Sequence, residues 1–294
     1  MTDGLFNLSK IAEKYVTNTI FIVLLASWRS RKKILYFILV NENQPHILCM
    51  RLCSEPKNEP EDSPMNRKTR LLSSVIINLI VAAATTGVIT SYFMGNITNV
   101  NFPHETLYFF TTDSNIIAAV GCVLTAAFEI AVLRGKRDSV PEWVRVIKYS
   151  GMVSLLLTFL TVIVFLLPLF GEETVTGTSF HMHIAAPLLT FASFVLLEND
   201  KKLGFSRIFC GMAPMLVYAA VYVLMAVVIG YGNGGWTDFY SFNRNGMWYV
   251  TLVMMTSVTF VLCASTRLLH NHILSHRNKR ASVAVLPGAA SFGK

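Results

Sequence analysis

Two residues far apart in the sequence have the side chains that nucleophilic catalysis needs. Thr111 carries a hydroxyl and His183 an imidazole, and each stands near the start of an apolar stretch. A hydroxyl attacks a carbonyl carbon when a base within hydrogen-bond distance removes its proton, and histidine is the usual base near neutral pH. We therefore predict Thr111 as a nucleophile and His183 as its general base.

Both residues also have a non-catalytic interpretation. The neighbours of Thr111, Thr112-Asp113-Ser114, are typical of a helix N-cap that satisfies free backbone N–H groups. His183 is alternatively an interfacial histidine whose ring bonds water or a carbonyl, although ionisable groups inside membrane spans are rare and usually functional. We interpret the nearby His181 as an interfacial residue.

Four more residues are predicted to contact a substrate beside this pair. Asn115 lies about one helical turn after the predicted nucleophile and is expected to stabilise an oxyanion. Tyr218 and Tyr222 follow Pro214 at i+4 and i+8, so they share one face of a helix. Trp236 lies in a loop on the same side of the membrane. For the tyrosines the alternative is packing between helices, and for Trp236 it is a place in the membrane interface.

The chain that must position these residues has the composition of a membrane protein. Of its 294 residues, 53% are hydrophobic and 14% charged, and the mean hydropathy is +0.51, which excludes a soluble globular domain. A helix that crosses a bilayer needs roughly 18 or more apolar residues. Six stretches meet this requirement or nearly so: Leu71 to Phe93, Asn115 to Val132, Gly151 to Phe170, His183 to Leu197, Ile208 to Ile229 and Trp248 to Leu269. We predict an all-α integral membrane bundle of six transmembrane helices.

The positive charges alternate from one connecting segment to the next. From residue 65 onward, sixteen Lys and Arg residues fall before the first, after the second, after the fourth, and at the end of or after the sixth stretch, and only Arg244 falls in the other three loops. Because such residues collect on the cytoplasmic side, we predict that both termini are cytoplasmic and that the protein lies in the cytoplasmic membrane. The net charge of +8 then reflects topology, so we expect no nucleic-acid partner.

Residues 1–64 are predicted to lie outside this bundle. Two short apolar pieces there are separated by Trp28-Arg29-Ser30-Arg31-Lys32-Lys33, and four cations at the centre of a span are prohibitive. The segment is either an interfacial basic helix with a flexible linker or an extension foreign to the native protein, because Met65 directly precedes the first span. The six-helix domain is then residues 65–275, and residues 276–294 form a cytoplasmic tail.

No metal or other cofactor is expected. Haem ligation by two histidines needs a facing partner at matching depth, but His104 lies in a loop and His270, His272 and His276 lie at the opposite end. A zinc site built on His181 and His183 lacks a third ligand, and the five cysteines show no metal-type spacing.

Three sequence features together resemble the Pr6Pr family of bacterial membrane proteins. They are Tyr108-Phe109-Phe110-Thr111-Thr112-Asp113-Ser114-Asn115, His183-Ile184-Ala185-Ala186-Pro187, and Glu198 at the end of that span. That family is distantly similar to the androgen-induced and androgen-dependent membrane hydrolases, which cleave esters linking two fatty acids with a threonine and a histidine. The resemblance covers residues 66–275 and implies Thr111 as the nucleophile and His183 as the base.

Three functional hypotheses follow. The first is a threonine/histidine hydrolase of lipid esters with an outward-facing intramembrane pocket, partnered by the bilayer and a lipid ester. The second is a non-enzymatic carrier or receptor for a small ligand, and the third is a structural membrane protein. A hydrogen bond between Thr111 and His183 would favour the first hypothesis, and a polar path to the cytoplasmic face would favour the second. The sequence leaves the oligomeric state open.

Overall fold

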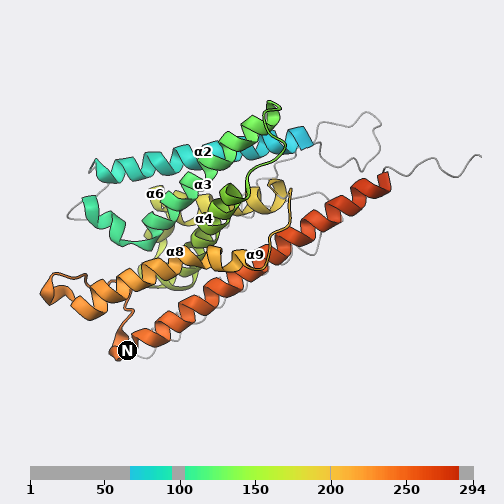
Figure 1. The fold of residues 1–294 in the computed structure, drawn as a ribbon. Helices are drawn as coiled ribbons and strands as arrows, with labels where there is room; N and C mark the ends of the chain where they lie inside the picture. The colour runs from blue at the N-terminus through green and yellow to red at the C-terminus, as the bar shows by residue number, and fades with distance from the viewer. Residues whose placement is uncertain (1–66, 95–102, 199, 285–294) are drawn as a thin grey trace, which may run out of the picture. The chain divides into compact units, whose positions relative to one another are not determined.

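The computed structural model describes residues 67–94, 103–198 and 200–284, and it confirms the all-α fold class. Within these ranges, six helices are long and apolar enough to cross a membrane (Figure 1), as a multi-pass membrane protein requires. The predictions for residues 1–64 fall outside the described residues.

Each predicted span corresponds to one of these helices. The first is α2 (Arg67–Phe93) and the second is α3 (Phe110–Leu133). The third begins with α4 (Glu142–Thr161) and continues through a π-helical turn (Val162–Leu166) into α5 (Leu167–Phe170). The fourth is built from α6 (Gly177–Phe180), a π-helical turn (His181–Ala185), α7 (Ala186–Ala192) and a second π-helical turn (Ser193–Leu197). The fifth is α8 (Arg207–Tyr222) followed by a π-helical stretch (Val223–Ile229), and the sixth is α9 (Trp248–Ala284).

Short 3-10 helices occupy the connecting segments. They are Pro103–Tyr108, Glu172–Val175, Tyr231–Asn233 and Arg244–Gly246.

Two of the π-helical turns end two residues before a proline. His181–Ala185 precedes Pro187, and Val162–Leu166 precedes Pro168. Proline has no N–H to donate to the preceding turn and its ring collides with that turn's carbonyl, so a locally widened helix accommodates it. The fourth span therefore begins at Gly177 and not at His183, and both histidines lie inside it.

Helix α4 forms the centre of the bundle. It contacts α3, α7, α8 and α9 (Figure 1). All eight residues from Lys148 to Leu155 are buried, which covers about two turns and therefore every face of the helix. Small residues bring α3 and α4 together, since a Cβ added to Gly151 would lie 2.7 Å from the Cα of Ala118.

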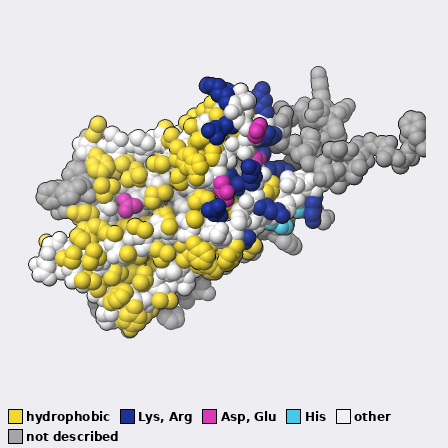
Figure 2. Space-filling model, viewed as in Figure 1, with side chains coloured by type: hydrophobic (Ala, Val, Ile, Leu, Met, Phe, Trp, Pro, Cys, Tyr) yellow, Lys and Arg dark blue, Asp and Glu magenta, His cyan; other side chains and the backbone are white. Residues whose placement is uncertain are grey.

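The outer surface is divided into an apolar belt and a charged end. Large apolar side chains on α2, α8 and α9 are exposed, among them Ile80, Val217 and Val261. Figure 2 shows hydrophobic side chains along the bundle and Lys and Arg side chains gathered at one end, which we call the cation-rich end. This arrangement agrees with the predicted alternation, and the cytoplasmic orientation of that end stays a prediction.

Two cations that the sequence places in the loop between the second and third spans lie inside a helix instead. Arg145 and Lys148 belong to α4, which begins at Glu142 and not at Gly151. Both are buried, and the Lys148 residue is 0% exposed. The prediction that they sit in a loop is wrong because they find polar partners inside the bundle.

Candidate functional site

The predicted nucleophile lies in the first turn of α3, at the end of the bundle opposite the cation-rich end. Helix α3 begins at Phe110 after Phe109, and no side chain caps it. Thr112, Asp113 and Ser114 are therefore inside the helix, and the interpretation of these residues as an N-cap is wrong. The Thr111 residue is partly exposed.

Asn115 joins the two predicted catalytic segments. Its Nδ2 donates hydrogen bonds to the carbonyl oxygen of Thr111 at 2.8 Å and to that of Met182 at 3.2 Å. Met182 directly precedes His183, so the start of α3 and the fourth span meet at one depth. Both amide hydrogens of Asn115 are used in these bonds, which makes Asn115 a residue that positions the two segments.

His183 is oriented by a backbone carbonyl. Its Nδ1 lies 2.6 Å from the carbonyl oxygen of Thr174. A carbonyl only accepts hydrogen bonds, so Nδ1 carries the proton, and in the neutral ring Nε2 keeps a free lone pair. This is the tautomer that a general base needs.

The hydroxyl of Thr111 and the ring of His183 are not hydrogen-bonded to each other. The only hydrogen bond of the His183 ring in the described part of the chain is the one to Thr174. Instead, the hydroxyl of Thr111 interacts with the phenol of Tyr240. The structure thus brings the two segments together without closing the predicted pair.

A different threonine and histidine do form a pair. Thr85 Oγ1 on α2 lies 3.0 Å from Nε2 of His181. Thr85 is buried, and it stands in the run Ala82-Ala83-Ala84-Thr85-Thr86, which carries no signal for a polar site. The interpretation of His181 as a plain interfacial residue missed this contact.

The three predicted aromatic substrate contacts pack the same end of the bundle. The Tyr218 hydroxyl donates to the carbonyl of Tyr108 at 2.6 Å, and the ring of Trp236 stacks on that of Tyr108 with centroids 4.7 Å apart. Tyr222 is buried and donates to Asp238 Oδ1 at 2.9 Å. Each of the three therefore has a partner within the protein.

Asp238 and Tyr240 hold the loop that covers this end. The carboxylate of Asp238 accepts hydrogen bonds from the backbone N–H groups of Phe242 at 2.7 Å and Asn243 at 2.9 Å. The Tyr240 hydroxyl accepts one from the Phe110 N–H at 3.2 Å. Burial raises the pKa of Tyr240 to about 12, because the phenolate would lose its hydration. The phenol therefore stays neutral beside Thr111 at physiological pH.

A second polar centre lies in the interior, closer to the cation-rich end. Nζ of Lys148 contacts Asn78 Oδ1 and lies 3.0 Å from Cys122 Sγ and 3.6 Å from Glu198 Oε1. The same Glu198 oxygen accepts hydrogen bonds from Asn78 Nδ2 at 3.0 Å and Ser193 Oγ at 2.6 Å. Four helices thus converge on one buried ion pair.

Glu129 lies near this centre. It is 1% exposed, and its Oε2 has no hydrogen-bond partner among the described residues. Glu129 therefore faces the bundle interior. With Glu198, Thr125 and Arg145 it lines a cavity of about 10 Å³, which is close to the space that one water molecule needs.

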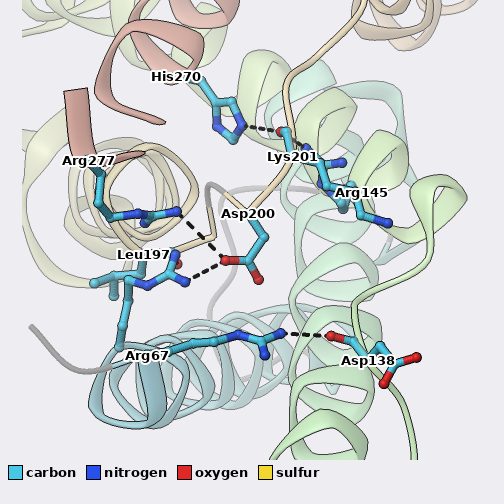
Figure 3. Close-up of polar contacts among 9 residues, drawn as sticks. Arg67, Asp138, Arg145, Leu197, Asp200, Lys201, His270 and Arg277 are labelled. Carbon is cyan, nitrogen blue, oxygen red and sulfur yellow. Dashed lines mark hydrogen bonds and ion pairs between the residues drawn. The ribbon is translucent and has the colours of Figure 1, made fainter. Parts of the chain in front are cut away.

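Charged side chains close the cation-rich end around Asp200 (Figure 3). Arg70 lies 2.5 Å and Arg277 3.8 Å from Asp200 Oδ1. Arg145 and His270 bond the carbonyl of Lys201. These contacts join α2, α4 and α9 to the segment that follows the fourth span.

Over the described residues, no group of three or more His, Cys, Asp or Glu side chains could hold a metal ion.

Comparison with known proteins found no relative: no family model, curated protein or solved structure matches this chain.

Proposed function

We propose that this multi-pass membrane protein is an intramembrane hydrolase that cleaves a carboxylic ester of a lipid at the Thr111 end of the bundle. Thr111 is the nucleophile and His183 is the general base. The resemblance of the segments around both residues to the Pr6Pr family, and through it to threonine hydrolases, supports these roles.

The observation that carries the proposal is the double hydrogen bond of Asn115. Its amide links the carbonyl of Thr111 to that of Met182, so a threonine and a histidine lie at the same depth although 72 residues separate them. The bond from His183 Nδ1 to Thr174 leaves Nε2 as the acceptor for the hydroxyl proton.

The chemistry then takes two steps. In the first, Thr111 Oγ1 attacks the ester carbonyl carbon, His183 Nε2 takes the hydroxyl proton, and the leaving alcohol receives that proton as its bond to the acyl group breaks. In the second, water attacks the acyl carbon and His183 takes a proton from it; the bond from that carbon to Thr111 Oγ1 then breaks as His183 returns the proton to Oγ1, which releases the acid and restores the hydroxyl. The N-terminus of α3 lies at Thr111 and favours the negative charge that develops on the carbonyl oxygen.

Closing the pair requires a side-chain movement. Thr111 must exchange its contact with Tyr240 for one with His183 Nε2 as substrate enters. An apolar ester reaches this end of the bundle sideways from the bilayer, so the substrate need not pass through water.

The test is covalent labelling of the purified protein with a fluorophosphonate probe. Wild type is expected to label, and Thr111→Ala and His183→Ala are expected to lose labelling and the hydrolysis of a long-chain p-nitrophenyl ester. Ser257→Ala is the matched control, because Ser257 is an exposed hydroxyl residue on α9 that bonds only its own helix. A wild type that does not label, or variants that label like wild type, would contradict the proposal.

A further inference from the structure

A groove at the cation-rich end lies between α9 and the segment that links the fourth span to α8. It has a volume of about 710 Å³. Its polar lining comes from Lys202, Arg267, Asn271, His272 and Ser275, and Leu268 and Leu269 complete it. None of these lining residues is acidic.

The wall of this groove is held in place by α9. The side chain of Asn271 bonds both backbone groups of Leu203, accepting from the N–H at 2.8 Å and donating to the carbonyl at 3.0 Å. Arg267 Nε donates to the same carbonyl at 3.0 Å, and Nε2 of His270 lies 3.2 Å from the carbonyl oxygen of Lys201. Three residues within two turns of one helix therefore clamp the segment against α9.

Two contacts fix the side chain of Arg267. Its Nε is fixed by Leu203, and its guanidinium carbon lies 5.7 Å from the centre of the Phe205 ring. No carboxylate pairs with Arg267 or Lys202 in the described ranges of the chain. The remaining N–H groups of the guanidinium form a planar fork, which matches the oxygens of a phosphate.

The depth of Arg267 fits the headgroup layer of a bilayer. It lies nineteen residues after Trp248 on α9, a distance of about 28 Å at a rise of about 1.5 Å per residue. The hydrocarbon layer is about 30 Å thick and tryptophan favours its border. Leu268 and Phe205 are 62% and 58% exposed beside the groove, so apolar surface for acyl chains adjoins the two cations.

We propose that this groove binds the headgroup of an anionic phospholipid. The phosphate pairs with Arg267 and Lys202, His272 and Ser275 bond the polar oxygens of the headgroup, and one acyl chain lies along Leu268. This site is at the other end of the bundle from Thr111, so it is independent of the proposed hydrolysis.

The test compares lipids on the full-length protein in dodecyl maltoside. Native mass spectrometry counts retained dioleoyl phosphatidylglycerol and dioleoyl phosphatidylcholine, and we expect the anionic lipid to be retained preferentially. Lys202→Gln and Arg267→Gln should each lower its retention about fivefold, equivalent to about 1 kcal/mol per cation. Lys136→Gln, which removes an exposed cation outside the groove, should retain it like wild type.

Several results would overturn the proposal. Equal retention of the two lipids, or an equal loss with Lys136→Gln, would mean that general surface charge explains the binding. Millimolar inorganic phosphate that raises the melting temperature as much as the anionic lipid does would identify free phosphate as the ligand. Because Arg267 also clamps Leu203, Lys202→Gln decides the outcome if Arg267→Gln does not fold.

Discussion

Nε2 of His181 lies 3.0 Å from the hydroxyl oxygen of Thr85, and this contact joins α2 to the fourth span. The pair has the geometry of a base beside a hydroxyl nucleophile. However, Thr85 is 1% exposed, so an ester carbonyl has no room to approach its oxygen. We therefore assign the pair to helix packing.

Thr85→Val tests this assignment, because valine keeps the shape of threonine and removes the hydroxyl. We expect lower stability, since a hydrogen bond of this kind contributes about 0.6 kcal/mol on average in membrane proteins. Fluorophosphonate labelling and ester hydrolysis should remain at the wild-type level. Loss of labelling in Thr85→Val, with labelling retained in Thr111→Ala, would move the nucleophile to Thr85.

We expect the stability of the bundle to depend strongly on whether both charges of the buried pair Lys148 and Glu198 are present. Lys148→Met leaves the Glu198 carboxylate buried without its cation, and breaking a buried pair in this way costs about 3 to 5 kcal/mol. The melting temperature in detergent should fall sharply. In contrast, Lys136→Met removes an exposed cation and should leave it unchanged.

The double variant Lys148→Met/Glu198→Gln separates the charge effect from the loss of packing. It should be more stable than Lys148→Met alone, because neither buried charge is then uncompensated. A double variant that is less stable than Lys148→Met would show that Glu198 stabilises the bundle independently of the lysine.

The six spans were predictable because length and apolar composition are local properties of the chain. The burial of Lys148 was not predictable, because its charge is compensated by Asn78 and Glu198, which lie 70 and 50 residues away in the sequence. A lysine three residues before an apolar run reads as the end of a loop. In the structure it belongs to a helix that begins six residues earlier, at Glu142.

The pairing at the Thr111 end was only partly predictable. The depth of Thr111 and of the fourth span followed from the topology, and the bond from Asn115 to Met182 agrees with it. Side chains two residues apart are rotated by about 200° around the helix axis and so point to nearly opposite sides. The rotation of the helix therefore decides whether His181 or His183 meets a given threonine. The π-helical turn at His181–Ala185 changes this rotation, and the presence of Pro187 in the sequence does not by itself fix that rotation.

From the environment of Tyr240 we predict how the stability of the protein responds to alkaline pH. Burial raises its pKa to about 12, whereas an unfolded tyrosine titrates near about 10. Its contribution to stability is therefore fully present below about pH 10 and is lost as the pH rises through about 12. Tyr240→Phe should flatten the fall in melting temperature between these two values, with the exposed Tyr249→Phe as control. An unchanged pH profile in Tyr240→Phe would show that this phenol is not the titrating group.

We expect alanine to have opposite effects on stability at two helical glycines, Gly151 at the contact between α3 and α4 and Gly87 on α2. A Cβ on Gly151 would lie 2.7 Å from the Cα and 2.8 Å from the backbone N of Ala118, whereas a Cβ on Gly87 would meet nothing within 4 Å. Backbone atoms cannot turn aside as a flexible side chain does, so Gly151→Ala must push the two helices apart. Overpacking of this kind costs about 1 to 3 kcal/mol, while Gly87→Ala gains helix propensity.

Thermal unfolding in detergent should show a lower melting temperature for Gly151→Ala and an equal or higher one for Gly87→Ala. Because Lys148 lies one turn from Gly151 on α4, Gly151→Ala should also weaken the buried ion pair. A Gly151→Ala protein as stable as wild type would contradict the close approach of the two helices.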